Sequence, residues 1–528
     1  SRTDSDSRYV NHNSNTAGTD NFIAGNNAGD AIQSGGNYNT VVGNEAGTAI
    51  TTGDRNVAVG FEAGKSISTG GENVAIGYQA LATEDGHGLN IAIGSEALEN
   101  LNAGSDAKNV AVGHNAGKNV TTGTVNVLIG SQAGDALKTG DNNIAIGHDA
   151  LGAEQEGDQN VAVGVGALQN QSNSSDTDVK NTAVGYNAGL SITTGVENTA
   201  IGHGALDANT TGQEITAIGV DAAGALNITN SGSPELTCVG FEAGKSVTDG
   251  GALTLIGHKA GKSLTGAVGV VIVGSGSGPD LTGSDNTFVG VQAGFTETSG
   301  VDNTLIGHDA GRNQNGGSGN TSVGSHCAES TTSGDNNTCI GKGAGANLTS
   351  GSNNMFLGFD AAIGGSPGGN QTTGSDTISL GDENIGSFNC QVSLTVASDQ
   401  RDKTDFTPLD LGLDFVKGLA PVTYRWDKRS KYGDKYADDY DLNAQTPDGT
   451  HKEDWLDVGF KAQEVEVLEK AAGYKIADKT NLTTTLSDDG KQYGIQYTKF
   501  VPMLVKAIQE LSAKNDALEA RIKKLEDG

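Results

Sequence analysis

Short apolar stretches recur along most of the chain at a fixed interval and alternate with polar, glycine-rich connections. One copy reads NVAVGFEAG at 56–64. The central glycines of successive copies, Gly43, Gly60 and Gly77, lie 17 residues apart, and related units continue to Gly358. We count about twenty such units, and self-similarity at a fixed period is typical of repeat architectures.

Within each unit the residue before the glycine is Val, Ile or Leu, as in Val59, and two residues earlier stands Val, Ile or Thr. This alternation predicts a short strand, and a small or apolar residue between them, such as Ala58, predicts that both strand faces are covered. An alanine three places after the glycine, such as Ala63, marks a second inward position. Connections such as TTGDRN at 51–56 are typical turn sequences. We therefore expect a unit of strand, turn, strand and turn.

Stacking such units buries an apolar face that one unit cannot bury alone. The predicted fold is an all-β repeat solenoid, a parallel β-roll, and association of three chains would cover the second apolar face. An intertwined triple β-helix is the alternative. The units resemble the β-roll heads of trimeric adhesins and repeats of bacteriophage tail fibres.

Composition agrees with a thin core. Glycine accounts for 80 of 528 residues and proline for only 7, which excludes collagen-like and proline-rich chains, and aromatic residues make up 5%. The formal net charge of −31 disfavours nucleic-acid and membrane-surface partners. No apolar run approaches the ~20 residues needed to cross a bilayer. Because the sequence begins at Ser1 rather than methionine, we expect a fragment or a processed product.

Two further residue types bear on binding chemistry. The four cysteines form no disulfide framework, and Cys238 and Cys339 stand at a repeat position where other units have small or apolar residues, so we expect them to be buried. Five histidines directly follow repeat glycines, and none lies in the unit next to another: His114, His148, His203, His258 and His308. We expect them to stack laterally, and we predict no metal site and no cofactor.

After about Cys390 the repeats stop, charged and aromatic residues increase, and both tryptophans appear. Four segments define this region: ASDQRDKTDF at 397–406, LDFVKGLAPVTYRWD at 413–427, DVGFKAQEVEVLEK at 457–470 and YGIQYTKFVPMLVKAIQEL at 493–511. Together they resemble the intramolecular chaperone domain of phage tailspikes and fibres, the family classed as S74 peptidases.

This resemblance implies a catalytic pair of Ser398 and Lys403, with cleavage between Ala397 and Ser398. A lysine amine desolvated by burial loses its proton more readily and then serves as general base for a serine hydroxyl. Residues five apart on a straight strand face opposite ways, so the chain must bend there or the pair must form between protomers. For Asp399 and Arg401 we expect a structural ion pair. The enzyme hypothesis is thus a single-turnover serine autoprotease without external substrates.

The last segment has apolar residues at alternating spacings of four and three, with one polar member. This pattern predicts a coiled-coil seam in which the asparagine fixes register and strand number; the alternative is an amphipathic helix packed on its own domain. The seam consists of Leu504, Ile508, Leu511, Asn515, Leu518, Ile522 and Leu525.

The predicted organisation has four parts. They are an N-terminal flanking segment at 1–20, the repeat stalk at 21–381, a transition segment at 382–397, and a small α+β chaperone domain at 398–528 with its coiled coil at 499–527.

The resemblance implies a phage tail fibre or spike protein for host-cell attachment, located in the virion and made in the host cytoplasm. Expected partners are two further copies in a homotrimer, other tail or baseplate proteins, and a host surface glycan or protein receptor, with neither nucleic-acid binding nor membrane insertion. A bacterial trimeric surface adhesin is one alternative. A fibre-borne glycan-degrading enzyme is a second, which the scattered acidic residues of the turns do not favour.

Overall fold

The computed structural model describes residues 10–11, 18–228, 234–248, 251–391, 396–435, 437 and 440–528. The chain folds as a parallel β-solenoid of about 19 turns, followed by a small domain with a C-terminal helix. It divides into two compact units, Ser1–Asn303 and Thr304–Gly528. No helix of the described residues is long and apolar enough to span a membrane.

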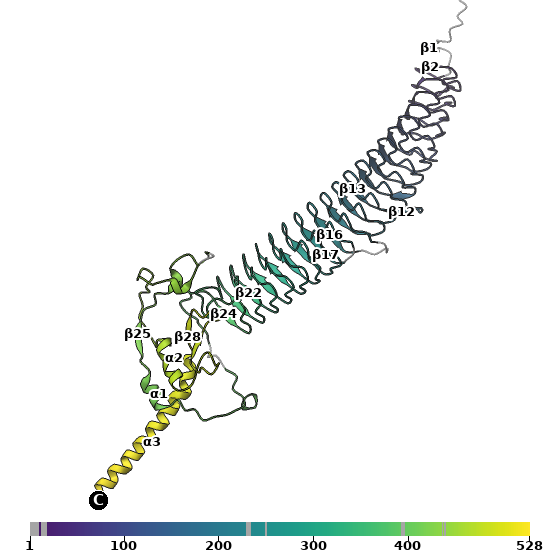
Figure 1. Ribbon diagram of the computed structural model, residues 1–528. Helices are drawn as coiled ribbons and strands as arrows, with labels where there is room; N and C mark the ends of the chain where they lie inside the picture. The colour runs from purple at the N-terminus through teal and green to yellow at the C-terminus, as the bar shows by residue number, and fades with distance from the viewer. Residues whose placement is uncertain are drawn as a thin grey trace, which may run out of the picture. The chain divides into compact units, whose positions relative to one another are not determined.

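In the first unit each coil contributes one short strand to a parallel ladder (Figure 1). β1 (Val10–Asn11) pairs antiparallel with β2, and β10 (Gly157–Asp158) pairs with β12 (Thr177–Asp178) in a separate two-stranded sheet. The ladder strands are β2 Phe22–Ala24, β3 Thr40–Val42, β4 Val57–Val59, β5 Val74–Ile76, β6 Ile91–Ile93, β7 Val110–Val112, β8 Val127–Ile129, β9 Ile144–Ile146, β11 Val161–Val163, β13 Thr182–Val184, β14 Thr199–Ile201, β15 Thr216–Ile218, β16 Leu236–Val239, β17 Leu253–Ile256, β18 Val271–Val273 and β19 Thr287–Val289.

The second unit contains further coils and the C-terminal domain. Its solenoid strands are β20 Thr304–Ile306, β21 Thr321–Val323, β22 Thr338–Ile340, β23 Met355–Leu357 and β24 Ile378–Leu380. The C-terminal domain consists of η1 Gln400–Asp402, α1 Leu413–Gly418, β25 Val422–Tyr424, η2 Arg429–Lys431, η3 Leu442–Ala444, β26 Asp457–Gly459, α2 Ala462–Ala471, β27 Thr484–Leu486, β28 Tyr493–Ile495, η4 Tyr497–Lys499 and α3 Phe500–Glu526.

Consecutive coils of the same chain pair in register. β4 pairs with β5 so that Ala58 lies opposite Ala75. In an intertwined triple β-helix neighbouring strands would come from different chains, so the single-chain solenoid is the fold and that alternative is wrong.

The central residue of each strand points into the core and its two neighbours point outward. Ala58 is fully buried, whereas Val57 and Val59 on either side of it are half-buried. The alanine after the repeat glycine is also fully buried, as predicted for Ala63. We call the outward β-branched positions the outer strand face; it forms a continuous apolar stripe in each unit.

The prediction of a second strand in each coil is wrong, because the segment after the repeat glycine is a run of turns. Glu62 and Gly64 have φ angles of 58° and 57°, left-handed conformations that no extended strand contains. The segment is still held to the next coil, since the Gly64 amide donates to the Ala80 carbonyl at 2.9 Å.

The repeat glycine is required by the close approach of the next coil. Gly60 has φ of 134°, and a Cβ on it would lie 2.4 Å from the Gly77 carbonyl oxygen. A side chain there would push neighbouring coils apart, which explains the strict repetition of glycine at this position.

A ladder of buried asparagines joins the coils on the inside. The Asn126 amide donates to Asn109 Oδ1 at 2.9 Å, while its Oδ1 accepts from the Asn143 amide at 2.9 Å and its Nδ2 donates to the Gly140 carbonyl at 2.9 Å. One side chain thus satisfies two polar backbone groups of the next coil. The bond from a backbone amide to the asparagine Oδ1 of the preceding coil recurs in the first unit at the buried residues Asn39, Asn56, Asn73, Asn90, Asn109, Asn143, Asn160, Asn181 and Asn198.

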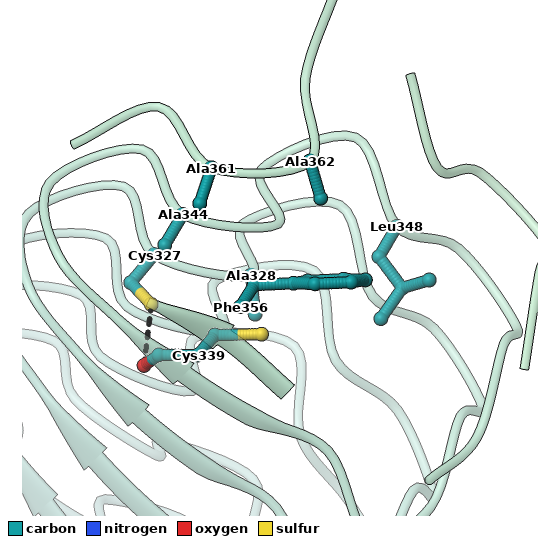
Figure 2. Packing of buried hydrophobic residues seen from close by; sticks show 8 residues of the cluster. All are labelled: Cys327, Ala328, Cys339, Ala344, Leu348, Phe356, Ala361 and Ala362. Carbon is teal, nitrogen blue, oxygen red and sulfur yellow. Dashed lines mark hydrogen bonds between the residues drawn. The ribbon is translucent and has the colours of Figure 1, made fainter. Parts of the chain in front are cut away.

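The apolar core is built in thin layers. Figure 2 shows the layer around Phe356, whose neighbours are alanines, Leu348 and two cysteines, all buried. Cys327 donates its thiol hydrogen to the Cys339 carbonyl at 2.9 Å. The neighbouring Cys339 side chain and burial raise the pKa of Cys327. Burial raises the pKa of Cys238 to about 12. Cys238 and Cys339 are therefore inert core residues, as predicted.

We expect Asn126→Ala to loosen the solenoid locally. The substitution leaves the Asn143 amide and the Gly140 carbonyl buried without their partner, which costs about 1–3 kcal/mol. Hydrogen–deuterium exchange of peptides covering 120–145 measures the loss of protection. The control is Asn142→Glu, because Asn142 is exposed and Glu72 occupies the same repeat position. Equal protection in the two variants would contradict the role of the ladder.

Candidate functional site

Ser398 and Lys403 meet at the start of the C-terminal domain. Lys403 Nζ donates to Ser398 Oγ at 2.5 Å and lies 3.3 Å from the Ser398 carbonyl oxygen. The single turn η1 lies between them, and Lys403 follows its last residue. This turn supplies the bend that brings residues five apart in sequence within hydrogen-bonding distance, so the contact forms within one chain.

Asp399 and Arg401 stabilise the same turn. The Asp399 carboxylate accepts from the Arg401 amide at 2.9 Å and from its guanidinium at 2.6 Å. These hydrogen bonds lower the pKa of Asp399 and raise that of Arg401. Both therefore stay charged, and the expected structural ion pair is present.

The Ser398–Lys403 pair is exposed in the single chain. Ser398, Lys403 and the neighbouring Ala397 all face solvent, and Val396 is 82% exposed. The burial that would help the lysine amine to lose its proton is therefore not supplied by this chain alone. The hydrogen-bonding geometry for proton transfer is in place, whereas the dry environment is not.

A cavity of about 860 Å³ lies elsewhere in the second unit. Aromatic residues of the C-terminal domain, including Tyr424, Trp426 and Tyr497, line it together with Asp382 and Glu383. Neither Ser398 nor Lys403 is among its lining residues. The candidate catalytic pair thus lies at an open turn and not in this cavity.

The predicted seam lies on the exposed side of α3. Phe500, Met503 and Ala507 face the domain and are buried, and every residue from 511 to 528 is exposed. Glu510 fixes the first part of the helix by accepting from the Leu413 amide at 2.8 Å, a bond that lowers the pKa of Glu510. Beyond this point the helix extends away from the rest of the domain (Figure 1). Val501 lies three residues before Leu504 and is 59% exposed, so it extends the predicted seam by one residue towards the start of the helix.

The core of the C-terminal domain is small. Leu411, Phe415, Val465, Phe500 and Met503 form it. Beside it the buried Glu469 carboxylate accepts from the Thr483 amide at 2.6 Å and hydroxyl at 2.8 Å, and from the Thr484 hydroxyl.

The family model Peptidase_S74, described as chaperone of endosialidase, matches residues 398–474. The chain carries an S74 chaperone domain at its C-terminus. The match begins at Ser398 and includes Lys403, Asp399 and Arg401, whereas α3 lies beyond it. No curated protein and no solved structure matches the chain. The catalytic roles of Ser398 and Lys403 and the predicted domain boundaries stay predictions.

An ion-pair cluster between the S74 domain and the preceding coils was not predicted. Lys435 Nζ lies 3.0 Å from Asp360 Oδ2 and 3.1 Å from Glu383 Oε1, and all three side chains are largely buried. Lys428 Nζ donates to the Glu383 backbone carbonyl at 2.5 Å. Burial disfavours the charged lysine, but the hydrogen bonds to Asp360 and Glu383 outweigh it and raise the pKa of Lys435. In a chain this rich in charged turns, no local pattern distinguishes these three residues.

We expect Lys435→Met to destabilise the S74 domain by about 3–5 kcal/mol, because it leaves two carboxylates buried without their cation. Both tryptophans lie in this domain, so urea unfolding followed by tryptophan fluorescence measures the change. The control is Lys452→Met, since Lys452 is exposed. Because the folded pKa is raised, the contribution is complete at neutral pH and is lost only above about pH 10. Equal midpoints for the two variants would contradict this role.

Proposed function

We propose that the protein is the subunit of a trimeric fibre or spike and that its S74 domain acts as an intramolecular chaperone. The domain brings three chains together, the solenoids then form side by side, and the chaperone cuts itself off between Ala397 and Ser398. The S74 domain match supports the fibre and chaperone parts of this proposal.

The observation that carries the proposal is the exposed seam of α3. Leu511, Leu518, Ile522 and Leu525 are between 46% and 81% exposed in the single chain. A helix with heptad spacing that leaves its apolar residues in water gains stability when equivalent helices cover them. Asn515 in the seam favours one register and one strand number.

The outer strand face supports the same conclusion. In the first unit it leaves Ile76, Ile129, Ile201 and Ile256, in four coils spread along the ladder, more than one-third exposed. Contiguous apolar surface of this extent marks an interaction site. Three parallel solenoids would cover these faces against one another.

Near-identical coils need an external reference for their alignment. If one solenoid slides by 17 residues against another, outward Val, Ile and Thr meet the same residue types and little is lost locally. Pairing over long distances is also slow and exposes sticky edges while it forms. A helical bundle that forms first would fix the three chains at one end and set the register for all coils.

The chemistry of cleavage follows from the Ser398–Lys403 contact. Neutral Lys403 accepts the Ser398 hydroxyl proton, and Oγ attacks the carbonyl carbon of Ala397. The new C–O bond forms as the C–N bond breaks, and the proton passes to the departing Ser398 amine. Water then hydrolyses the ester, which leaves the Ala397 carboxylate and restores the Ser398 hydroxyl. Because the pair is exposed in one chain, we propose that packing of neighbouring subunits around this turn supplies the burial and times the cleavage.

Attachment to a host cell by a phage tail fibre or tailspike is the biological role we propose. Its support is the order of four sequence segments that resemble phage fibre chaperones, together with a long repetitive stalk. The location in a virion, the partners in the tail and a surface receptor belong to the same proposal.

We expect Ser398→Ala to abolish cleavage. On a denaturing gel the wild type should give two bands, of 397 and 131 residues (528 − 397), and the variant one band of full length. Lys403→Met should behave like Ser398→Ala because it removes the base. The control Thr404→Ala keeps both groups and should be cleaved normally. Two bands from Ser398→Ala would refute the serine as nucleophile.

We expect Leu518→Glu to prevent trimer formation, since three carboxylates would meet in an apolar seam. The change is made in the Ser398→Ala background so that the helix stays attached. Light scattering after size exclusion should show trimers for the parent and monomers or aggregates for the variant. The control Ala517→Glu places the same charge off the seam and should leave trimers intact. A trimeric Leu518→Glu protein would show that α3 does not direct assembly.

A further inference from the structure

Two histidines and a buried aspartate meet at one edge of the second unit. His308 follows the repeat glycine Gly307, whereas His326 stands two residues after Gly324, one position later in the unit. Because of this offset the two residues lie in neighbouring coils with ring centroids 5.3 Å apart, in an edge-to-face arrangement. The other histidines differ: His203 stacks on Tyr186 and His258 on Phe241.

The distances between the possible ligand atoms suit a metal ion. Asp309 Oδ2 lies 3.0 Å from His308 Nδ1 and 3.8 Å from His326 Nδ1. One ligand atom from each of the three residues lies within 4.8 Å of the others. Four-coordinate zinc with bonds of about 2.1 Å places neighbouring ligand atoms roughly 3.4 Å apart. Small side-chain rotations would therefore bring all three atoms around one ion.

The hydrogen bonding of Asp309 is a second, independent observation. This residue is only 4% exposed, and its Oδ1 has no hydrogen-bond donor among the described residues. The Nε atom of Arg312 forms an ion pair with Oδ1 at 3.6 Å, a distance too long for a hydrogen bond. A buried carboxylate with an unsatisfied oxygen is costly unless a cation balances it. The half-exposed histidine rings leave the site open to solvent on one side.

Glu329 supplies the surrounding support. Its Oε2 lies 2.9 Å from His326 Nδ1. This is the nitrogen that also faces Asp309, so Glu329 adds a second negative charge beside the proposed ion.

We infer that His308, Asp309 and His326 bind one divalent transition-metal ion, with Zn²⁺ as the best fit. Two imidazoles and one carboxylate favour zinc over magnesium or calcium, which prefer oxygen ligands alone. The three protein ligands leave a fourth position for water. The site would fasten two neighbouring coils near the S74 end of the solenoid.

A second cluster of similar composition, Glu84, Asp85 and His87, provides an internal control. Its Glu84 carboxylate already accepts from the His87 amide at 3.0 Å and from the Ala103 amide at 3.3 Å. These bonds occupy both carboxylate oxygens in the structure of the turn, so we assign no metal to this cluster.

The repeats offer substitutions that the fold accepts. Ser95 and Ser131 occupy the position of His308 in other coils, and Gln79 and Gln132 occupy that of His326, with φ angles of 52° and 60° against 56° for His326. His308→Ser and His326→Gln therefore remove ligands with residues that other coils use. His87→Gln is the matched control.

The test measures Zn²⁺ binding to the full chain by calorimetry and by elemental analysis after metal removal, with excess Mg²⁺ to occupy carboxylate sites. We expect one zinc per wild-type chain, at least tenfold weaker binding by His308→Ser and His326→Gln, and no change for His87→Gln. Glu329→Gln should also weaken binding, because it removes a negative charge beside the ion. Wild type without zinc, unchanged binding by His308→Ser, or loss of binding by His87→Gln would overturn the inference.

A measurement on the unaltered chain keeps the test decisive if a variant misfolds. Co²⁺ should give the intense visible bands of a four-coordinate site with nitrogen ligands. A weak spectrum typical of six oxygen ligands would overturn the assignment.

Discussion

The in-register stacking of one coil directly on the next is the constraint on which the rest of the structure depends. Coils approach so closely that a Cβ on the repeat glycine would meet the carbonyl oxygen of the next one. At this separation the asparagine ladder satisfies backbone amides and carbonyls that three-residue strands leave unpaired. Buried polar groups are costly when unpaired, so each coil folds only with its neighbour in place. The stability of the solenoid is therefore collective, and its register is the quantity that must be set correctly.

The ladder itself contains a limited register signal. Aliphatic residues replace the asparagine in four successive coils of the first unit, at Ile215, Leu236, Leu253 and Val270, and all four are buried. A coil stacked out of order there would place an asparagine against an apolar side chain and leave its amide unsatisfied. Elsewhere in the chain neighbouring coils are nearly equivalent inside and outside. This ambiguity is the physical reason for the proposed alignment role of the C-terminal domain.

Much of the fold could be predicted from the sequence, because glycine, alanine and β-branched residues at fixed spacing define the coil. The second strand could not, since it depends on positive φ angles at residues such as Glu62, and local sequence does not reveal that glutamate adopts them. The asparagine ladder was not anticipated, because an asparagine next to a turn also fits a solvent-exposed loop.

The candidate sites could be predicted only where a motif or a regular spacing marked their residues. The S74 motif indicated Ser398 and Lys403, and their contact needed only the local turn η1. The Lys435 cluster joins residues from three distant segments, so no spacing indicates it. The sequence analysis missed the pairing of His308 with His326 because it considered only histidines directly after a repeat glycine.

The exposure of the Ser398–Lys403 pair agrees with the proposed order of events, in which assembly precedes cleavage. If the pair were buried within one chain, cleavage would remove the helix before three chains had met, and the alignment would be lost. A serine hydroxyl without a general base is a weak nucleophile, and activating it needs an environment shielded from water. In the proposed mechanism, neighbouring subunits packed around the turn supply this dry environment. A reaction that depends on burial between chains thus cannot precede the association it is meant to follow.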